Sequence, residues 1–340
     1  MKALVYTEPH KAEVKDVPLP RGRPGAAKVR MHCCGVCGTD IGIFSGQHPR
    51  ARAPLVLGHE FVGTIEDVQG GSGRLAVGDR VVAYPLLSCG HCRPCQAGQP
   101  HVCETLQLIG IDRDGGMAET AWIDEDALFK VPASLPDTIA ALIEPLAVVV
   151  RSLHQARFNL LDTAVVIGAG PIGVLTAIVL KRSGASRVIV SDMDQARLDL
   201  CAGLGFEMVN VRKISLVDHV RESTDDGGVD LVFECSGAGP AAAEMTELAR
   251  VGGTICMTGV HKAPRAVDLR AINFKEQLLV GSRVYTKREF EMSVSYAQEL
   301  AADLQSVVTH TVPLSASEGI FEMIADSSVS TLKLVVDCQA

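Results

Sequence analysis

Reactive side chains are most closely clustered in one short segment of this 340-residue chain. The segment holds four of the eleven cysteines: Cys89, Cys92, Cys95 and Cys103. Disulfides, a redox pair or a metal ion could explain thiols this close together. An odd cysteine count fits poorly with a pure disulfide framework, and the Gly/Pro-rich surroundings lack the strand–helix context of a redox CxxC. Spacings of two, two and seven residues let four thiolates surround one Zn²⁺. We therefore expect a structural zinc lobe at about residues 88–104.

A second group of metal-ligating residue types comes earlier. The stretch "GVCGTD" supplies Cys37, and "LGHEFVG" supplies His59 and Glu60. A thiolate, an imidazole and a carboxylate are sufficient protein ligands for a catalytic zinc that keeps one position open. Glu144, in the apolar run "ALIEPLAV", is a fourth candidate because a buried carboxylate is costly unless it is paired or binds a metal.

The segment "VVIGAGPIG" matches the G-x-G-x-x-G pattern, after a strand-like run and before a helix-like one. In this context the first glycine makes a tight turn, the second lets the backbone approach a pyrophosphate, and the third allows close helix–strand packing. Phosphates bind at the N-terminus of such a helix. We expect the following residues to contact the cofactor here: Gly168, Gly170, Pro171, Ile172 and Gly173.

An acidic residue ends the second strand-like run of this region, in "VIVSDMD". Asp192 can bind both ribose hydroxyls, and its charge repels a 2′-phosphate, so the sequence indicates NAD rather than NADP. The alternative is a solvated strand-end residue, as we interpret Asp194. Arg197 could pack on the adenine or pair with Asp194 on the helix surface.

The pattern of predicted secondary structure changes near residue 160. Before it, short strand-like runs separated by Pro and Gly predict an irregular β-barrel or sandwich. After it, six strand-like runs alternate with helix-like ones, which predicts a doubly wound parallel sheet of six buried strands. A helix-like run and a β-like tail, "TLKLVVDC", follow residue 286.

Composition limits the class of protein. Hydrophobic residues make up 47% and charged residues 21%, and the net charge is −8. This balance suits a globular core and disfavours nucleic acid or an anionic membrane as partner. The N-terminus lacks the apolar region of a signal peptide, and the longest apolar runs are interrupted. We expect a cytoplasmic protein, in which thiols stay reduced.

Taken together, the GHE motif, the four-cysteine lobe, the glycine motif and the acidic residue resemble the zinc-containing medium-chain dehydrogenases over essentially the whole chain. "EPLAV" is similar to the branch of sorbitol, threonine and sugar-acid dehydrogenases. The resemblance implies an α/β protein with a GroES-like β-barrel catalytic domain, 1–150 and 286–340. A Rossmann NAD-binding domain, 151–285, is inserted in it, with substrate in the cleft between them.

The resemblance also implies residue roles. Cys37, His59 and Glu60 ligate the catalytic zinc, and Glu144 joins them directly or through water. Thr39 takes the proton of the alcohol, while the alkoxide passes hydride to NAD. Many relatives carry a histidine three residues after this threonine to finish the proton relay, but here that position is Gly42. Water or another histidine, such as His48, would have to serve.

Further pocket residues are expected where the last two strands of the parallel sheet end. Carboxyl ends of such strands face the cofactor, so Thr258, Gly259 and Ser282 are candidate cofactor contacts, with a purely structural role in their loops as the equal alternative. Phe44 and Arg283 are candidate substrate contacts. Arg283 could hold a substrate carboxylate through two parallel hydrogen bonds, or it could anchor its own loop.

The sequence thus predicts an enzyme with two zinc ions per chain that oxidises a secondary alcohol to a ketone with NAD. We expect a polyhydroxylated substrate, with a sugar acid such as an aldonate slightly ahead of a polyol. L-Threonine and 2,3-butanediol are alternatives. A non-catalytic NAD sensor is disfavoured because every expected zinc ligand is present, and a nucleic-acid-binding zinc ribbon lacks a basic face. The expected partners are the small-molecule alcohol or ketone and further copies of the chain, in a homodimer or homotetramer.

Overall fold

The computed structural model describes residues 1–225, 227–326 and 328–340. It contains two compact units: Met1–Pro145 with Thr286–Ala340, and Leu146–Tyr285. The first unit is discontinuous because the second is inserted in the chain. The first boundary lies inside helix α4 (Ile143–Ala156), five residues before the one expected from the sequence. No helix in the described part of the chain is both long and apolar enough to cross a membrane.

The first unit is built on two sheets, in the orders β2-β1-β4 and β10-β6-β5-β3-β18-β17, with β9 added to β3. A small hairpin, β7 and β8, accompanies them. The strands are β1 (Lys2–Glu8), β2 (Lys11–Asp16), β3 (Ala26–Gly35), β4 (Leu55–Val56), β5 (Glu60–Gln69), β6 (Arg80–Ala83), β7 (Leu86–Leu87), β8 (Gln107–Leu108), β9 (Thr120–Asp124), β10 (Leu128–Lys130), β17 (Val308–Pro313) and β18 (Lys333–Asp337). The α-helices that lie wholly in this unit are α1 (Gly38–Phe44), α2 (Arg93–Gln96), α3 (Asp137–Ala140), α10 (Lys287–Glu299), α11 (Ala301–Gln305) and α12 (Ile320–Ala325).

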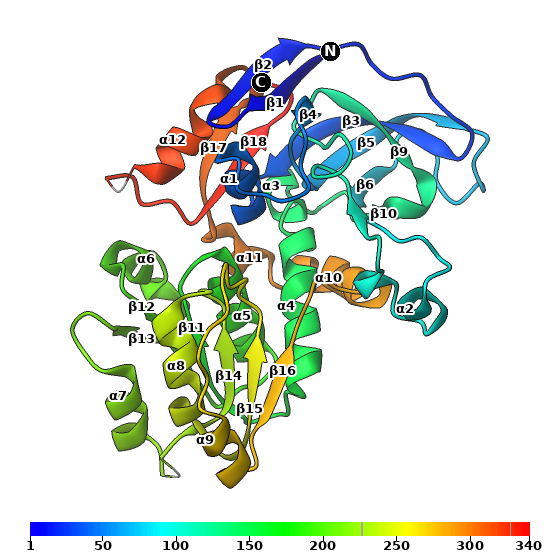
Figure 1. Ribbon diagram of the computed structural model, residues 1–340. Coiled ribbons are helices and arrows are strands. Elements are labelled where there is room, and N and C mark those ends of the chain that lie inside the picture. The colour runs from blue at the N-terminus through cyan, green and yellow to red at the C-terminus, as the bar shows by residue number, and fades with distance from the viewer. Residues whose placement is uncertain (226, 327) are drawn as a thin grey trace. The chain divides into compact units, whose positions relative to one another are not determined.

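Strand β3 is the centre of the larger sheet. Val29 and Met31 are fully buried, while Lys28 and Arg30, which alternate with them, are partly exposed; this is the period of two expected when one face meets the core. Antiparallel β18 pairs with the end of β3, with Val335 opposite Gly35. The first and last parts of the chain therefore share one sheet (Figure 1).

The second unit confirms the predicted doubly wound sheet. Its six strands are all parallel, in the order β13-β12-β11-β14-β15-β16, which is the dinucleotide-binding arrangement. The strands are β11 (Thr163–Ile167), β12 (Arg187–Asp192), β13 (Glu207–Asn210), β14 (Val229–Glu234), β15 (Ala249–Met257) and β16 (Leu278–Gly281). The helices are α5 (Pro171–Arg182), α6 (Gln195–Leu200), α7 (Leu216–Ser223), α8 (Gly239–Leu248) and α9 (Leu269–Phe274).

Apolar strand residues explain the core of this unit. Four neighbouring strands each contribute a fully buried residue to it: Val165, Ile189, Val232 and Ile255. The expectation of six buried strands is wrong for β16, where Leu278 and Leu279 are 42% and 40% exposed. The reason is position, because β16 lies at the edge of the sheet and has no neighbouring strand beyond it.

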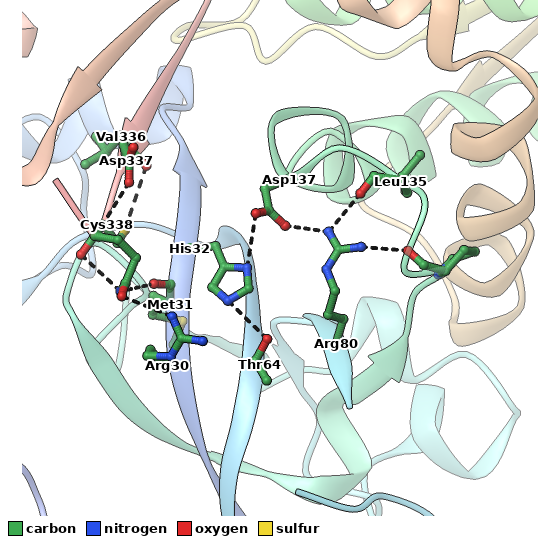
Figure 2. A network of polar contacts seen from close by, with 12 residues as sticks. Arg30, Met31, His32, Thr64, Arg80, Leu135, Asp137, Val336, Asp337 and Cys338 are labelled. Atoms are coloured by element: carbon green, nitrogen blue, oxygen red, sulfur yellow. Dashed lines mark hydrogen bonds and ion pairs between the residues drawn. The ribbon is translucent and has the colours of Figure 1, made fainter. Parts of the chain in front are cut away.

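A polar network ties helix α3 to the larger sheet of the first unit (Figure 2). His32 of β3 lies between Thr64 of β5, 3.0 Å from Nε2, and Asp137 at the start of α3, 3.1 Å from Nδ1. Arg80 of β6 also binds Asp137, and it donates to the carbonyls of Pro132 and Leu135 at 2.7 and 2.8 Å. This network fixes the segment that leads into α4.

The same network predicts a pH-dependent stability. Burial raises the pKa of Asp137, but hydrogen bonds from His32 and Arg80 outweigh it and hold that pKa below the ordinary 3.8. A lowered pKa in the folded state stabilises the fold above the ordinary value, and the gain is lost as the pH falls through the folded pKa. Because the Asp137 side chain is 37% exposed, we expect Asp137→Asn to cost only about 1 kcal/mol at pH 7.

Urea unfolding followed by fluorescence measures this, because the chain's single tryptophan, Trp122, lies in β9 of the same unit. The midpoints of wild type and variant should converge below about pH 4. Asp16→Asn is the control, since Asp16 is 79% exposed and pairs with Lys2 on the surface. An Asp137→Asn variant whose deficit persists unchanged at low pH would refute the role of the charge.

Candidate active site

The four clustered cysteines form the geometry of a closed metal site. Their ligand atoms all lie within 4.8 Å of one another. The Sγ atoms of Cys89 and Cys95 are 4.0 Å apart, and those of Cys92 and Cys103 are 3.8 Å apart. A tetrahedron with Zn–S bonds of about 2.3 Å has edges of about 3.8 Å, whereas a disulfide is about 2.05 Å long. The residues therefore fit a structural zinc.

The electrostatics of this lobe also favour a cation. Backbone N–H groups of His91 and Cys92 lower the pKa of Cys89 to about 6, so this thiol is readily ionised. Burial and the neighbouring thiol of Cys92 raise the pKa of Cys95 to about 12. Four neighbouring thiols cannot all ionise unless a cation compensates their negative charge. A bound cation would therefore favour loss of the remaining thiol protons.

Cys37, His59 and Glu60 come together in the first unit, with their ligand atoms within 4.8 Å of one another. Cys37 caps helix α1, and Glu60 opens strand β5 directly after His59. His59 and Glu60 are 4% and 1% exposed. His59 Nδ1 is buried without a hydrogen-bond partner among the described residues. A buried polar atom left without a partner and a mixed S, N and O donor set both fit a zinc ion.

Negative charge surrounds this cluster. Burial lowers the pKa of His59, but the charges of Cys37, Asp40 and Glu144 outweigh it and raise that pKa well above its ordinary value. Asp40 is fully buried, lies 4.0 Å from His59 Nδ1 and accepts the Cys37 backbone N–H at 2.8 Å. Sequence reasoning missed Asp40, although its place in "GTD" beside the ligand was a usable signal.

A buried lysine neutralises part of that negative charge. Sequence reasoning also missed this residue. Lys333 of β18 is 2% exposed, forms an ion pair with Glu60 Oε2 and donates to the carbonyl of Val36 at 2.9 Å. A Cβ at Gly35 would lie 2.2 Å from that carboxylate, so only glycine admits the pair. Lys333 thus balances the charge of Glu60 inside the cluster.

The remaining expected residues of this unit are placed less directly. Thr39 Oγ1 lies 3.7 Å from Cys37 Sγ, which suits its expected role. Glu144 lies outside the 4.8 Å set, but its charge raises the pKa of both His59 and Lys333. Phe44 stacks on Phe321 with ring centroids 4.3 Å apart, so its described contact is packing.

Gly42 leaves open space where a relay histidine would project, because nothing lies within 4 Å of a Cβ built there. His48 is next to it, since the His48 backbone N–H donates to the Gly42 carbonyl at 3.0 Å. Its Nδ1 accepts from the Ala51 N–H at 3.2 Å. Burial and the charge of Arg50 lower the pKa of His48.

In the second unit the glycine motif forms the expected turn between β11 and α5. Gly168 has φ 106°, a conformation that favours glycine. A Cβ at Gly173 would lie 1.8 Å from the Gly168 carbonyl oxygen, whereas a Cβ at Gly170 would meet nothing within 4 Å. The space at Gly170 lies at the N-terminus of a twelve-residue helix, which is where phosphates bind.

Asp192 ends β12 and is joined to that turn. Its carboxylate accepts from the Ala169 N–H at 2.7 Å and from the Asp194 N–H at 2.9 Å. Each carboxylate oxygen keeps a second lone pair for a ribose hydroxyl. Arg197 lies 3.7 Å from Asp194, which is the surface pair that the sequence left open as an alternative.

The strand-end residues differ in their partners. The hydroxyls of Thr258 and Ser282 each lie 3.1 Å from that of Ser152, so they form a chain of hydroxyl groups within the unit. The Gly259 backbone N–H donates to the Glu234 carbonyl at 2.7 Å. Arg283 is exposed, and its guanidinium has no ion pair or hydrogen bond among the residues that the structure describes.

Mutation should distinguish the roles of the two cysteine-containing sites. Cys37→Ser should lose one of two zinc ions per chain together with turnover, because a ligand sets both affinity and Lewis acidity. Cys95→Ser should lose the other ion and lower stability first. Zinc content by mass spectrometry, measured alongside kcat, checks both variants. Cys201→Ala, a buried thiol outside both sites, is the control; a Cys37→Ser variant with two zinc ions and normal turnover would refute the assignment.

Family models match both parts of the chain. Residues 23–133 match the alcohol dehydrogenase GroES-like domain, and residues 171–299 match the zinc-binding dehydrogenase domain. The first match lies in the unit that holds Cys37, His59 and Glu60, and it confirms the expected GroES-like fold. The second begins at the N-terminus of α5.

Two relatives of known name match over nearly their whole length. A 2-dehydro-3-deoxy-L-galactonate 5-dehydrogenase of Pseudoalteromonas atlantica is 34% identical over 320 residues, which cover 93% of each chain. An L-threonine 3-dehydrogenase of Sinorhizobium fredii is 34% identical and covers 99% of this chain and 98% of its own.

Solved structures agree with these relatives. The 2R,3R-butanediol dehydrogenase of Bacillus subtilis superposes with a TM-score of 0.92 at 26% identity, covering 99% of both chains. A zinc-binding dehydrogenase of Sinorhizobium meliloti 1021 was solved with NADP (TM-score 0.90, 28% identity, 99% and 98% covered). An alcohol dehydrogenase of E. coli CFT073 was solved with NADH (TM-score 0.89, 28% identity, 99% of both chains). The chain therefore belongs to the zinc-type medium-chain dehydrogenases, in the branch of sugar-acid and threonine dehydrogenases, and it is an oxidoreductase.

Proposed function

We propose that this enzyme oxidises a secondary alcohol of a polyhydroxylated small molecule to a ketone, with NAD as hydride acceptor. The observation that carries the proposal is the convergence of Cys37, His59 and Glu60 in a buried, negatively charged site. Zinc bound there supplies Lewis acidity that lowers the pKa of a substrate hydroxyl.

The chain's own residues have separate tasks in this proposal. Cys37, His59 and Glu60 bind the metal. Glu144 is the fourth ligand, either directly or through a water molecule. Thr39, 3.7 Å from Cys37 Sγ, accepts the substrate proton. His48 takes the place of the missing histidine at Gly42, because it is the neighbouring imidazole and a neutral ring can receive a proton.

The cofactor preference rests on Asp192. The carboxylate is fixed at the end of β12 by two backbone N–H groups, so it cannot move aside for a 2′-phosphate. A phosphate of about −2 beside a fixed carboxylate is repelled. We therefore propose NAD over NADP, while Gly168, Gly170 and Gly173 cradle the phosphates and Arg197 stays with Asp194.

The substrate class rests on Arg283. An exposed guanidinium without a partner among the described residues is suited to bind a carboxylate with two hydrogen bonds. The galactonate-derived substrate in the name of one relative is a sugar acid. We therefore place a sugar acid ahead of a neutral polyol. The threonine and butanediol relatives make L-threonine and 2,3-butanediol the second candidates.

The test is NADH formation at 340 nm across a panel of aldonates, neutral polyols, L-threonine and 2,3-butanediol. We expect turnover with an aldonate, and with NAD far more than with NADP. Arg283→Ala should raise KM for the aldonate by about tenfold or more while KM for a neutral polyol stays unchanged. An enzyme that prefers NADP, or an Arg283→Ala variant that affects acid and polyol equally, would contradict the respective assignment.

We also propose that the enzyme is a homo-oligomer in which β16 pairs with β16 of a second copy. An edge strand has unpaired backbone N–H and C=O groups, and here Leu278 and Leu279 are exposed on its two faces. On helix α9, Leu269 and Phe274 are 72% and 76% exposed. Across a two-fold axis, the unpaired backbone groups of β16 in one copy can bond to those of β16 in the other.

Light scattering of matched variants tests this interface. Leu279→Lys should shift the particle toward the monomer, because a charged side chain would have to be buried in the shared edge. Leu161→Lys is the control, since Leu161 is 68% exposed in the same unit but belongs to no strand. Unchanged assembly of the Leu279→Lys variant would refute the β16 interface.

A further inference from the structure

A fully buried carboxylate at the carboxyl edge of the parallel sheet has no part in the proposed chemistry. Glu234 ends β14 and is 0% exposed. Its Oε1 accepts the backbone N–H groups of Ser236 and Gly237, each at 2.9 Å. Its Oε2 lies 3.1 Å from Nε2 of His261. The residue therefore joins the turn after β14 to the turn after β15.

The two turns are packed without spare room. The backbone N–H groups of Thr258 and Gly259 donate to the Glu234 carbonyl at 2.9 and 2.7 Å. A Cβ at Gly259 would lie 2.5 Å from the Gly237 nitrogen, and a Cβ at Gly237 would lie 2.7 Å from the Val260 oxygen. These contacts fix the start of the second turn. At its end, the side chain of His261 links the turn to the Glu234 carboxylate.

The position of these turns assigns them to one half of the cofactor. In a doubly wound sheet the dinucleotide lies across the carboxyl edge at the switch point, here between β11 and β14. The adenosine half belongs to the β12 side, where Asp192 lies, and the nicotinamide half belongs to the side of β14 and β15. The Gly168 turn also touches this region, since a Cβ there would lie 3.1 Å from Ser236 Cβ.

We infer that His261, through its hydrogen bond to Glu234, is a positioning residue for the nicotinamide half of the cofactor. The inference rests on the proposed dehydrogenase function. Without the imidazole, the 258–261 turn keeps its first two backbone bonds but loses the side-chain link between its far end and Glu234. The turn then spreads over several conformations, and cofactor binding must select one of them.

Calorimetric titration with NADH and with ADP-ribose, which lacks nicotinamide, separates this role from a general structural one. We expect His261→Ala to weaken NADH binding by about tenfold or more, the effect of one hydrogen bond to a charged group. ADP-ribose affinity should change by less than about twofold. His261→Gln keeps an N–H donor on a side chain of similar reach and should recover most of the NADH affinity.

A matched control lies in the same unit. His219 pairs with Glu207 at 2.5 Å, but Glu207 begins β13 and so lies at the amino end of the sheet. His219→Ala should leave both affinities unchanged. Equal loss of NADH and ADP-ribose binding by His261→Ala, or no loss at all, would overturn the inference. Wild-type protein that fails to bind ADP-ribose would instead overturn the cofactor assignment itself.

Discussion

The enclosure of negative charge in the β-barrel is the constraint around which the first unit is arranged. Asp40, Glu60 and Glu144 are buried carboxyl groups, and the Cys37 thiol lies among them. Such a collection is unstable in an apolar interior unless cations balance it. Lys333 supplies one fixed positive charge, and the donor set supplies a place for a divalent one. The same excess of negative charge that would destabilise an empty barrel favours the binding of a zinc ion.

The second unit uses carboxylates differently. Asp192 and Glu234 each accept backbone N–H groups from a turn at the carboxyl edge of the sheet. Asp192 is partly exposed and keeps lone pairs for a ligand, whereas Glu234 is fully enclosed and can only support the turns around it. Burial, rather than residue type, thus separates a carboxylate that is open to a ligand from one that only supports the fold.

What could be predicted from the sequence was mainly what lies within one short segment. The cysteine lobe and the glycine turn depend on spacings of a few residues, and both were placed correctly by pattern. Lys333 was missed because its meaning depends on a strand pairing between the two ends of the chain.

Two further features were not foreseen, for the same physical reason. The stacking of Phe44 on Phe321 could not be foreseen, because no local pattern links the two residues, and the role of Phe44 as a substrate contact stays a prediction. The apolar sequence of β16 predicted burial, but burial depends on the position of a strand in the sheet, which periodicity does not report. Predictions from sequence therefore fail where a residue's environment is set by distant chain.

The pairing of β18 with β3 has a consequence for synthesis on the ribosome. The inserted unit, Leu146–Tyr285, is translated in full before Lys333 exists, and domains generally fold as units while the chain grows. Until β18 emerges, Glu60 has no ammonium partner and β3 lacks one neighbour. The first unit is therefore still incomplete at a stage when every residue of the inserted unit is available for folding. The group of Cys37, His59 and Glu60 therefore gains its ammonium partner only after the whole inserted unit has been synthesised.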